Sequence, residues 1–238
     1  MLDKRVVALI PARGGSKRLK NKNIRKFCGK PLITWTIALA LSVKEIDTVL
    51  VSTDDPRIAT ISRRHGAEII NRPPQLATDE AMTIDVIHHA VTYMEQMGRS
   101  HELMLYLEPT CPLRSESDLL HALSLLVSAE KFDSVASFSS AELHPHRAWT
   151  LDGNKPEPFI RGAIPWLPSQ KLPAAYQLNG AVYAFWIDRM DEQTVSPLYG
   201  KIGSFLIPKQ RALDIDDEID FQFAEFLMKR KWLYARDS

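Results

Sequence analysis

The sequence predicts an α/β fold in which helices flank a mostly parallel central sheet. Short apolar runs of strand length alternate with longer amphipathic segments, which is typical of repeated strand–helix–strand units. The chain has 238 residues, of which 45% are hydrophobic, so it can bury one large core. We therefore expect a single domain over residues 1–238, with an inserted arm at about 141–177.

The expected strands are apolar runs that end in polar or proline-containing loops. They cover residues 5–10, 48–52, 68–70, 103–107, 134–138, 181–186 and 204–207. In open α/β sheets, ligands lie outside the carboxyl ends of the strands. Binding residues are therefore expected in the loops that follow these strands.

The expected helices begin at capping signals or follow from the spacing of apolar residues. They lie at about residues 31–41, 55–65 and 84–94, from 115 onward, and at about 217–231. Pro31 suits a first helical turn, Asp55 is an N-cap before Pro56, and residues 115–118 resemble a capping box. The closing helix is apolar at Ile219, Phe223, Phe226 and Leu227.

The regular pattern breaks between residues 141 and 177, which contain six prolines and have no clean period. A loop of this length inside a compact domain is usually functional or an interface. We interpret the segment as a β-arm that contributes to dimerisation.

The overall composition excludes several classes of protein. Lys and Arg number 30 and Asp and Glu 29, so no general attraction to nucleic acid or to a membrane surface is expected. The two cysteines, Cys28 and Cys111, form no disulfide framework. The apolar run at residues 6–10 is too short for a signal peptide, and no run has the length of a membrane helix. A soluble cytoplasmic protein is expected.

Charge is nevertheless segregated along the chain. Ten Lys or Arg residues and no acid lie between Lys4 and Lys30, and five acids and no base lie between Asp214 and Asp220. Two solvated faces would explain this pattern. A basic loop and an acidic cluster are also the two components that a metal–triphosphate site needs.

A glycine-containing basic loop, residues 10–19, follows the first expected strand. Its two glycines let the backbone approach an anion closely, and Arg13, Lys17 and Lys22 add positive charge. The loop has neither the spacing of a Walker loop nor that of a dinucleotide fingerprint. Phosphate binding is therefore one interpretation and an ordinary basic turn is the other.

A second loop, residues 107–114, follows another expected strand and is stiffened by two prolines, so it would hold Glu108 and Arg114 in place. The simpler interpretation is a stiff connection with two solvated charges.

A third motif contains Asp214 and Asp216, which face the same side of an extended segment and suit a hard divalent cation. Helix N-terminal acids would explain the residues after Asp216 equally well.

Taken together and in this order, the motifs resemble those of the acylneuraminate cytidylyltransferases, also called CMP-sialic acid synthetases. The resemblance runs from Val6 to about Phe226. It rests on residues 10–17, 22–24, 52–54, 72–73, 108–114, 179–183 and 214–216.

The resemblance implies a Rossmann-like nucleotide-diphospho-sugar transferase fold, a homodimer and a Mg²⁺ cofactor. It implies that the anomeric hydroxyl of an acidic keto-deoxy sugar attacks the α-phosphate of CTP and releases pyrophosphate. The base that would accept the hydroxyl proton is not evident from the sequence.

The resemblance also implies roles for individual residues. The positions implied to bind CTP are Arg13, Ser16, Lys17, Lys22, Asn23, Arg72, Thr83, Glu108 and Thr110. Asp214 and Asp216 fall on the metal-holding pair and, with Lys22 and Arg13, form the implied catalytic set. The positions implied to bind the sugar are Arg147 on the neighbouring subunit's arm, Gln177 and Asn179.

This chain departs from the family pattern at the base and sugar positions. Many members have Gln in place of Glu108, and several sialic acid enzymes have arginines in place of Ser169 and Gln177. We therefore expect a sugar other than plain N-acetylneuraminic acid, such as the di-N-acylated legionaminic acid. Two alternatives are a cytidylyltransferase for an eight-carbon keto-deoxy acid and a non-catalytic nucleotide-binding module.

Overall fold

A computed structural model describes residues 3–236 and confirms the α/β fold with a mostly parallel sheet. Within these residues the main sheet has seven strands in the order β11-β7-β10-β6-β1-β4-β5. Their bounds are Val6–Pro11 (β1), Thr48–Thr53 (β4), Glu68–Asn71 (β5), Leu103–Tyr106 (β6), Ser134–Ser140 (β7), Tyr176–Trp186 (β10) and Ile202–Leu206 (β11). In this sheet β10 runs antiparallel to β6 and β7, and the other neighbouring pairs are parallel.

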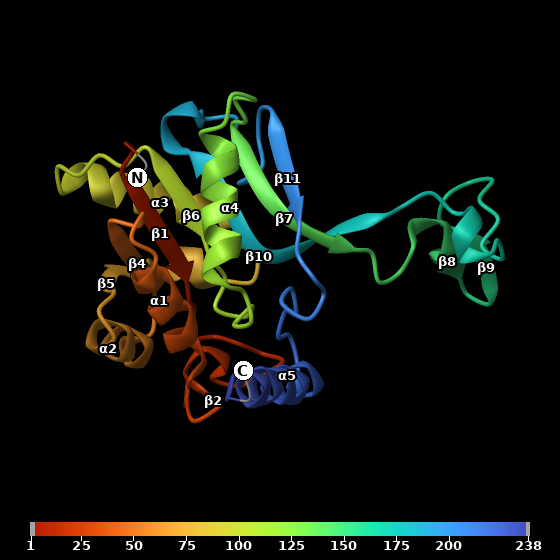
Figure 1. Ribbon diagram of the computed structural model, residues 1–238, viewed down its shortest axis with the longest axis horizontal. Coiled ribbons are helices and arrows are strands. Elements are labelled where there is room, and N and C mark those ends of the chain that lie inside the picture. The colour runs from red at the N-terminus through yellow and green to blue at the C-terminus, as the bar shows by residue number, and fades with distance from the viewer. Residues whose placement is uncertain (1–2, 237–238) are drawn as a thin grey trace.

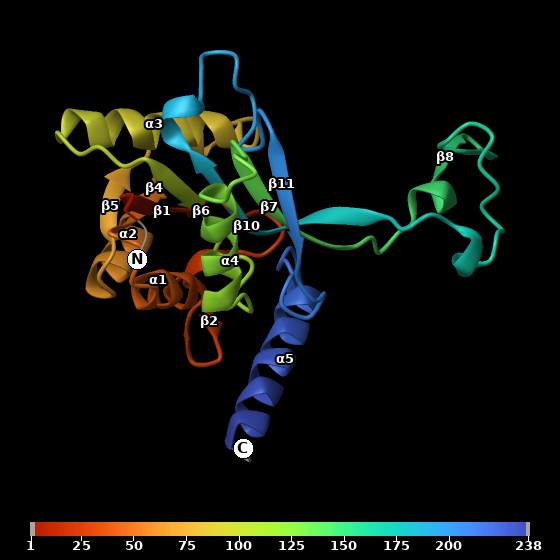
Figure 2. The same ribbon diagram turned by 45° about the horizontal axis from the view of Figure 1, so that its top comes forward.

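Helices cover both faces of the sheet, so the body has three layers (Figure 2). They are α1 (Leu32–Ser42), α2 (Pro56–Arg64), α3 (Thr83–Gln96) and α4 (Glu116–Leu126). A further helix, α5 (Glu218–Arg236), extends away from the sheet (Figure 2). The side chain of Asp55 accepts hydrogen bonds from the N–H groups of Arg57 and Ile58, and Ser115 forms a capping box with Asp118. These contacts confirm the capping signals that predicted the starts of α2 and α4.

The core is divided by the sheet because successive strand side chains point to opposite faces. On β1, Val6, Ala8 and Ile10 pack into the cluster under α1 and α4, and Val7 and Leu9 pack into the cluster under α3. All of these side chains are completely buried. This packing fixes the register of β1 and therefore the place where the glycine-containing loop begins.

The segment at 141–177 projects from the body as an arm, continued from the long ends of β7 and β10 (Figure 1). Its tip carries a hairpin of β8 (Trp149–Asp152) and β9 (Lys155–Pro158). Large apolar side chains lie on its surface, including Trp166 at 84% exposure and Leu151 at 74%. The arm therefore offers an apolar surface that this chain does not itself cover.

Helix α5 packs beside a short two-stranded sheet of β2 (Lys26–Phe27) and β3 (Lys30–Pro31). Among its residues 218–230 the buried positions are Phe221, Ala224 and Met228, which share one core cluster with Phe27. The apolar positions singled out from the sequence prove to be mostly exposed: Ile219, Phe223 and Phe226 lie on the outer surface, and only Leu227 packs against the core. Within the part of the chain that the structure describes, none of the helices has the combination of length and hydropathy that a membrane span requires.

Candidate active site

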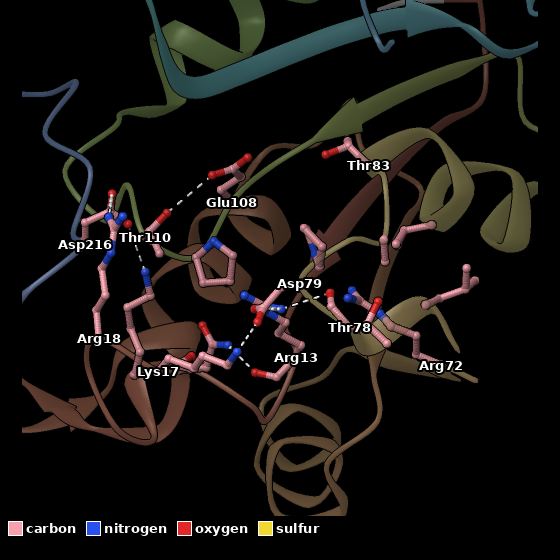
Figure 3. Close-up of a pocket in the computed structure, with 18 of the residues that line it drawn as sticks. Arg13, Lys17, Arg18, Arg72, Thr78, Asp79, Thr83, Glu108, Thr110 and Asp216 are labelled. Carbon is pink, nitrogen blue, oxygen red and sulfur yellow. Dashed lines mark hydrogen bonds and ion pairs between the residues drawn. The ribbon is translucent and has the colours of Figure 1, made fainter. Parts of the chain in front are cut away.

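A cavity of about 680 Å³ lies at the carboxyl ends of β1, β5 and β6, where ligands bind in open α/β sheets. Every residue implied to bind CTP lines this cavity, and Asp216 joins them (Figure 3). The set comprises Arg13, Ser16, Lys17, Lys22, Asn23, Arg72, Thr83, Glu108, Thr110 and Asp216. Loops far apart in sequence therefore meet as the motif order predicted.

The loop after β1 is held in shape by backbone contacts. The N–H of Gly14 donates to Asp54 Oδ1 at 2.9 Å, and Asn23 Nδ2 donates to the carbonyl of Arg13 at 3.0 Å. A Cβ at Gly14 would lie 2.8 Å from Asp55, so only glycine fits there. A Cβ at Gly15 would meet nothing within 4 Å, so this part of the loop leaves room for a ligand.

Asp79 pairs with two cations of the loop, Arg13 and Lys17 (Figure 3). Its carboxylate is 2.8 Å from Arg13 Nη1 and also pairs with Lys17 Nζ, while Arg13 donates to the carbonyl of Thr78. The hydrogen bonds from Lys17 and Arg13 lower the pKa of Asp79. A carboxylate thus lies beside the cations that an incoming anion would contact. No motif in the sequence indicated that Asp79 would contact these cations.

Lys22 joins the basic loop to the acidic segment. It stands at the start of a 3₁₀ turn, η1 (Lys22–Ile24), and its side chain is only 16% exposed. Its Nζ donates to the carbonyl of Ile215 at 2.7 Å and lies 3.5 Å from Asp216 Oδ1. Asp216 also pairs with Arg18 Nη1 at 3.3 Å. The basic and acidic runs therefore form one continuous site.

The acidic segment is fixed by Ile215, which is completely buried and whose N–H donates to the carbonyl of Thr110 at 2.9 Å. Asp214 and Asp216 flank it and are both exposed. Among the described side chains, residues 3–230, no three or more His, Cys, Asp or Glu gather as a metal cage. Carboxylate oxygens nevertheless fit Mg²⁺, which is commonly held by one or two carboxylates together with substrate phosphates and water.

The opposite wall of the cavity contains buried polar groups. Arg72 is 7% exposed; its Nε donates to Ser52 Oγ and its Nη2 to the carbonyl of Ser52. Burial lowers the pKa of this guanidinium and raises that of the Tyr106 phenol beside it. Sequence reasoning missed Tyr106, because a tyrosine inside an apolar strand gives no signal beyond core packing.

The loop after β6 is held by Arg114, whose buried guanidinium donates to the carbonyls of Cys111, Ala181 and Glu108. It therefore presents Glu108 at a fixed place. Thr110 Oγ1 donates to Glu108 Oε2 at a long 3.5 Å, and a Cβ at Gly180 would lie 3.6 Å from that oxygen. Burial, followed by the charge of Asp214, raises the pKa of Glu108 to about 7.

A second cavity, of about 400 Å³, adjoins the first through Glu108, which lines both. Gln177, Asn179 and Asp214 line it, so two of the three residues implied to bind the sugar lie together. Arg147 lies on the arm, where its Nη2 donates to the carbonyl of Leu167 and to Ser169 Oγ. It lines neither of these cavities of its own chain, and its implied role on a neighbouring subunit stays a prediction.

Comparison with known proteins identifies the class to which this fold and site belong. A family model described as cytidylyltransferase matches residues 7–195, and the chain belongs to that family. It is therefore a nucleotidyltransferase, as the motifs predicted.

The relatives include enzymes for several nine-carbon sugar acids. The chain is 34% identical to the CMP-N,N'-diacetyllegionaminic acid synthase of Legionella pneumophila, over 94% of this chain and 97% of that protein. It is 30% identical to the pseudaminic acid cytidylyltransferase of Campylobacter jejuni, over 94% and 96%. It is 29% identical to the N-acylneuraminate cytidylyltransferase of Escherichia coli, over 95% of this chain and 53% of that protein, so it spans about half of that relative's length.

A solved structure shows the same fold. It is a CMP:2-keto-3-deoxy-manno-octonic acid synthetase complexed with CTP, with a TM-score of 0.66 and 19% identity, covering 95% of this chain and 99% of that one. The similarity confirms the predicted nucleotide-sugar transferase fold.

The raised pKa of Glu108 has a measurable consequence for stability. The pKa of Glu108 rises from 4.5 to about 7 on folding. Between pH 4.5 and about pH 7 the folded state therefore binds this proton more tightly than the unfolded chain does. The contribution of Glu108 to the free energy of unfolding is therefore full below pH 4.5, falls as the pH rises, and is lost above about pH 7. Glu108→Gln is expected to be more stable than the parent by up to roughly 3 kcal/mol near pH 8, and about equal to it near pH 4.

Urea unfolding of both proteins at about pH 4, 6 and 8, with EDTA present, measures this difference. Glu95→Gln, on the exposed surface of α3, is the matched control and should show no such trend. A Glu108→Gln difference that does not change with pH would contradict the raised pKa.

Proposed function

We propose that this chain transfers CMP from CTP to the anomeric hydroxyl of a nonulosonic acid and releases pyrophosphate. The observation that carries the proposal is the pair of adjoining cavities. One is lined by the basic loop and Asp216, the other by hydrogen-bonding side chains, and both meet at Glu108. A donor nucleotide and an acceptor sugar need such neighbouring sites, because catalysis of phosphoryl-type transfer consists mainly of positioning and charge stabilisation.

In this proposal the first cavity holds CTP. The glycine-containing basic loop and the 3₁₀ turn that follows it provide the proposed phosphate contacts, Arg13, Ser16, Lys17 and Lys22. Asn23 supports this loop through its hydrogen bond to the carbonyl of Arg13. Arg72, Thr83, Glu108 and Thr110 line the remaining walls and are the proposed contacts of the cytidine.

The chemical step forms a bond between the sugar hydroxyl oxygen and the α-phosphorus and breaks the bond from that phosphorus to the β-phosphate bridging oxygen. Pyrophosphate leaves with the electron pair of the broken bond. Lys22 would stabilise the charge that grows on the phosphates. The hydroxyl proton passes to a carboxylate that lines the second cavity, for which Glu108 and Asp214 are the candidates.

Asp214 and Asp216 are the proposed ligands of Mg²⁺. When bound, the ion would neutralise phosphate charge. Lys22 and Arg18, which contact Asp216 here, keep that carboxylate close to the phosphate-binding loop.

For the acceptor we propose a di-N-acylated sugar of the legionaminic type. Support comes from the 34% identical Legionella synthase, whose name specifies that sugar, and from the uncharged Ser169 and Gln177.

We also propose a homodimer assembled through the arm, because a second copy of the chain would bury the exposed apolar surface of the arm. Arg147 of the neighbouring subunit would then approach the sugar.

The proposal is tested by measuring pyrophosphate release with each of the four ribonucleoside triphosphates. The acceptors are N,N'-diacetyllegionaminic acid, N-acetylneuraminic acid and the eight-carbon keto-deoxy-manno-octonic acid. Only CTP should support turnover, and kcat/KM should be highest with the legionaminic acid. A tenfold preference for N-acetylneuraminic acid, about 1.4 kcal/mol in transition-state binding, would refute the sugar assignment. Release with none of the acids would refute the function.

The pairing of Asp79 with Arg13 and Lys17 predicts competition with CTP. Because the triphosphate must displace this carboxylate, Asp79→Asn is expected to bind CTP more tightly, by roughly two- to fivefold for an exposed ion pair. Calorimetric titration with CTP measures the change. Glu80→Gln removes the neighbouring exposed acid and should leave the affinity unaltered. Weaker binding by Asp79→Asn would mean that Asp79 assists the nucleotide instead.

A further inference from the structure

The second cavity has a charge pattern that does not suit an anionic ligand. Four carboxylates line it, those of Glu108, Glu142, Asp214 and Asp220, and Lys209 is the single Lys or Arg among its described lining residues. A sugar acid brings a further negative charge. Because like charges repel strongly at short range, the carboxylate of such a ligand needs a positively charged binding position within this cavity.

The ammonium group of Lys209 can provide that positive charge. It lies in the loop between β11 and the acidic segment, and its side chain is exposed. Among the side chains that the structure describes, those of residues 3–230, its ammonium group has no hydrogen bond or ion pair. By contrast, Arg211 in the same loop is bound to Asp118 at 2.8 Å. Lys209 therefore lies at the cavity with its charge uncompensated.

Two amide side chains of β10 provide further donors. The Oε1 of Gln177 accepts from the N–H of Glu142 at 2.8 Å, and the Oδ1 of Asn179 accepts from the N–H of Ala181 and from Ser137 Oγ. Backbone N–H groups can only donate, so these contacts fix which end of each amide is oxygen.

The NH₂ groups of both amides are thus the ends left for a ligand. Asn179 is 7% exposed, and its Nδ2 is buried with no hydrogen-bond partner among the described residues. An unsatisfied buried donor is costly and needs an explanation, such as an acceptor that arrives with the ligand.

We propose that Lys209, with the amide N–H groups of Gln177 and Asn179, binds the carboxylate of the acceptor sugar within one subunit. This inference rests on the proposed function, which makes the acceptor a sugar acid. One ammonium and two amide donors match the lone pairs of a carboxylate. In a 2-keto sugar acid the carboxylate and the anomeric hydroxyl share one carbon. Anchoring the carboxylate here therefore directs that hydroxyl toward Glu108 and the nucleotide cavity.

The test compares binding of the sugar acid with binding of its neutral carboxamide, measured by calorimetry in the presence of CMP and without turnover. For the parent, the acid should bind more tightly than the carboxamide. Lys209→Met should weaken binding of the acid by roughly 10- to 100-fold and leave the carboxamide nearly unchanged. Lys209→Arg should restore most of the preference, and the KM for CTP should be unaltered in both variants.

Lys44→Met, an exposed lysine that lines neither cavity, is the matched control. Equal weakening of acid and carboxamide by Lys209→Met, or no weakening of either, would overturn the inference while parent turnover leaves the proposed function intact. Loss of the acid preference in Arg147→Met but not in Lys209→Met would assign the carboxylate to the arm and also overturn it. Failure of the parent to bind or turn over any sugar acid would overturn the proposed function together with this inference.

Discussion

Replacement of Asp216 by Asn is expected to lower kcat by roughly 100-fold or more while leaving the fold intact. The exchange removes one of the two carboxylates proposed to hold Mg²⁺ beside the phosphates. Asp216 is more than half exposed, and its contacts are ion pairs with Arg18 and Lys22 at the surface of the cavity, so little packing is lost. The decrease in kcat is measured from steady-state turnover at saturating CTP across a Mg²⁺ titration.

Asp217→Asn is the matched control for this variant. Asp217 is the next acid in the chain, and its Oδ1 accepts from the N–H groups of Ile219 and Asp220 at the start of α5. Asn can also accept these bonds, so activity and stability should be close to those of the parent. Near-parental turnover by Asp216→Asn with unchanged Mg²⁺ dependence would refute the metal assignment.

Lys22→Ala is the second change with a large expected effect. A charge contact that strengthens as pyrophosphate leaves affects kcat more than KM, and its loss should cost roughly 100-fold in kcat. Lys22 is well placed for this because its ammonium lies between the loop after β1 and Asp216, 2.7 Å from the carbonyl of Ile215. Single-turnover measurements with saturating CTP separate the chemical step from binding.

The same contact to Ile215 means that Lys22→Ala also loosens the acidic segment, so its thermal unfolding is measured alongside. Lys22→Arg keeps the charge and should retain more activity than Lys22→Ala. Lys20→Ala, exposed and outside both cavities, should behave like the parent. An unchanged kcat with a raised KM for the sugar alone would show that Lys22 does not act on the triphosphate.

Much of the fold was predictable because its local signals agree with its tertiary packing. The central strands β1, β4 and β6 are short apolar runs buried on both faces, and the caps at Asp55 and Ser115 mark where α2 and α4 begin. The nucleotide cavity was predictable for a related reason. Many of its residues follow β1, β5 and β6, and the carboxyl ends of these strands lie at one edge of the sheet.

Contacts between distant loops were not predictable in this way. Asp79 lies in a polar run after β5, and nothing in its neighbours indicates that it would face Arg13. The buried face of α5 was also missed. Apolar residues occur on more than one side of this helix, so Ile219 and Phe223 could not be distinguished from the buried Phe221 by spacing alone.

The direction of the arm could not be predicted from the sequence either. Its prolines predicted an excursion from the sheet, but its direction depends on how far β7 and β10 extend past their neighbours. Arg147 therefore lies away from the cavities of its own chain, whereas Lys209, which carries no motif signal, lines the second cavity. Tertiary geometry rather than residue pattern brings Lys209 to that site.

The most direct measurement is the identity of the product. The chain is incubated with CTP, Mg²⁺ and N,N'-diacetyllegionaminic acid, and the mixture is analysed by mass spectrometry and ³¹P NMR. We expect equal amounts of pyrophosphate and of a CMP-linked sugar whose single phosphorus is a phosphodiester, with neither formed when EDTA replaces Mg²⁺. Release of free CMP without a sugar-linked product, or no consumption of CTP with this or any other nonulosonic acid, would contradict this expectation.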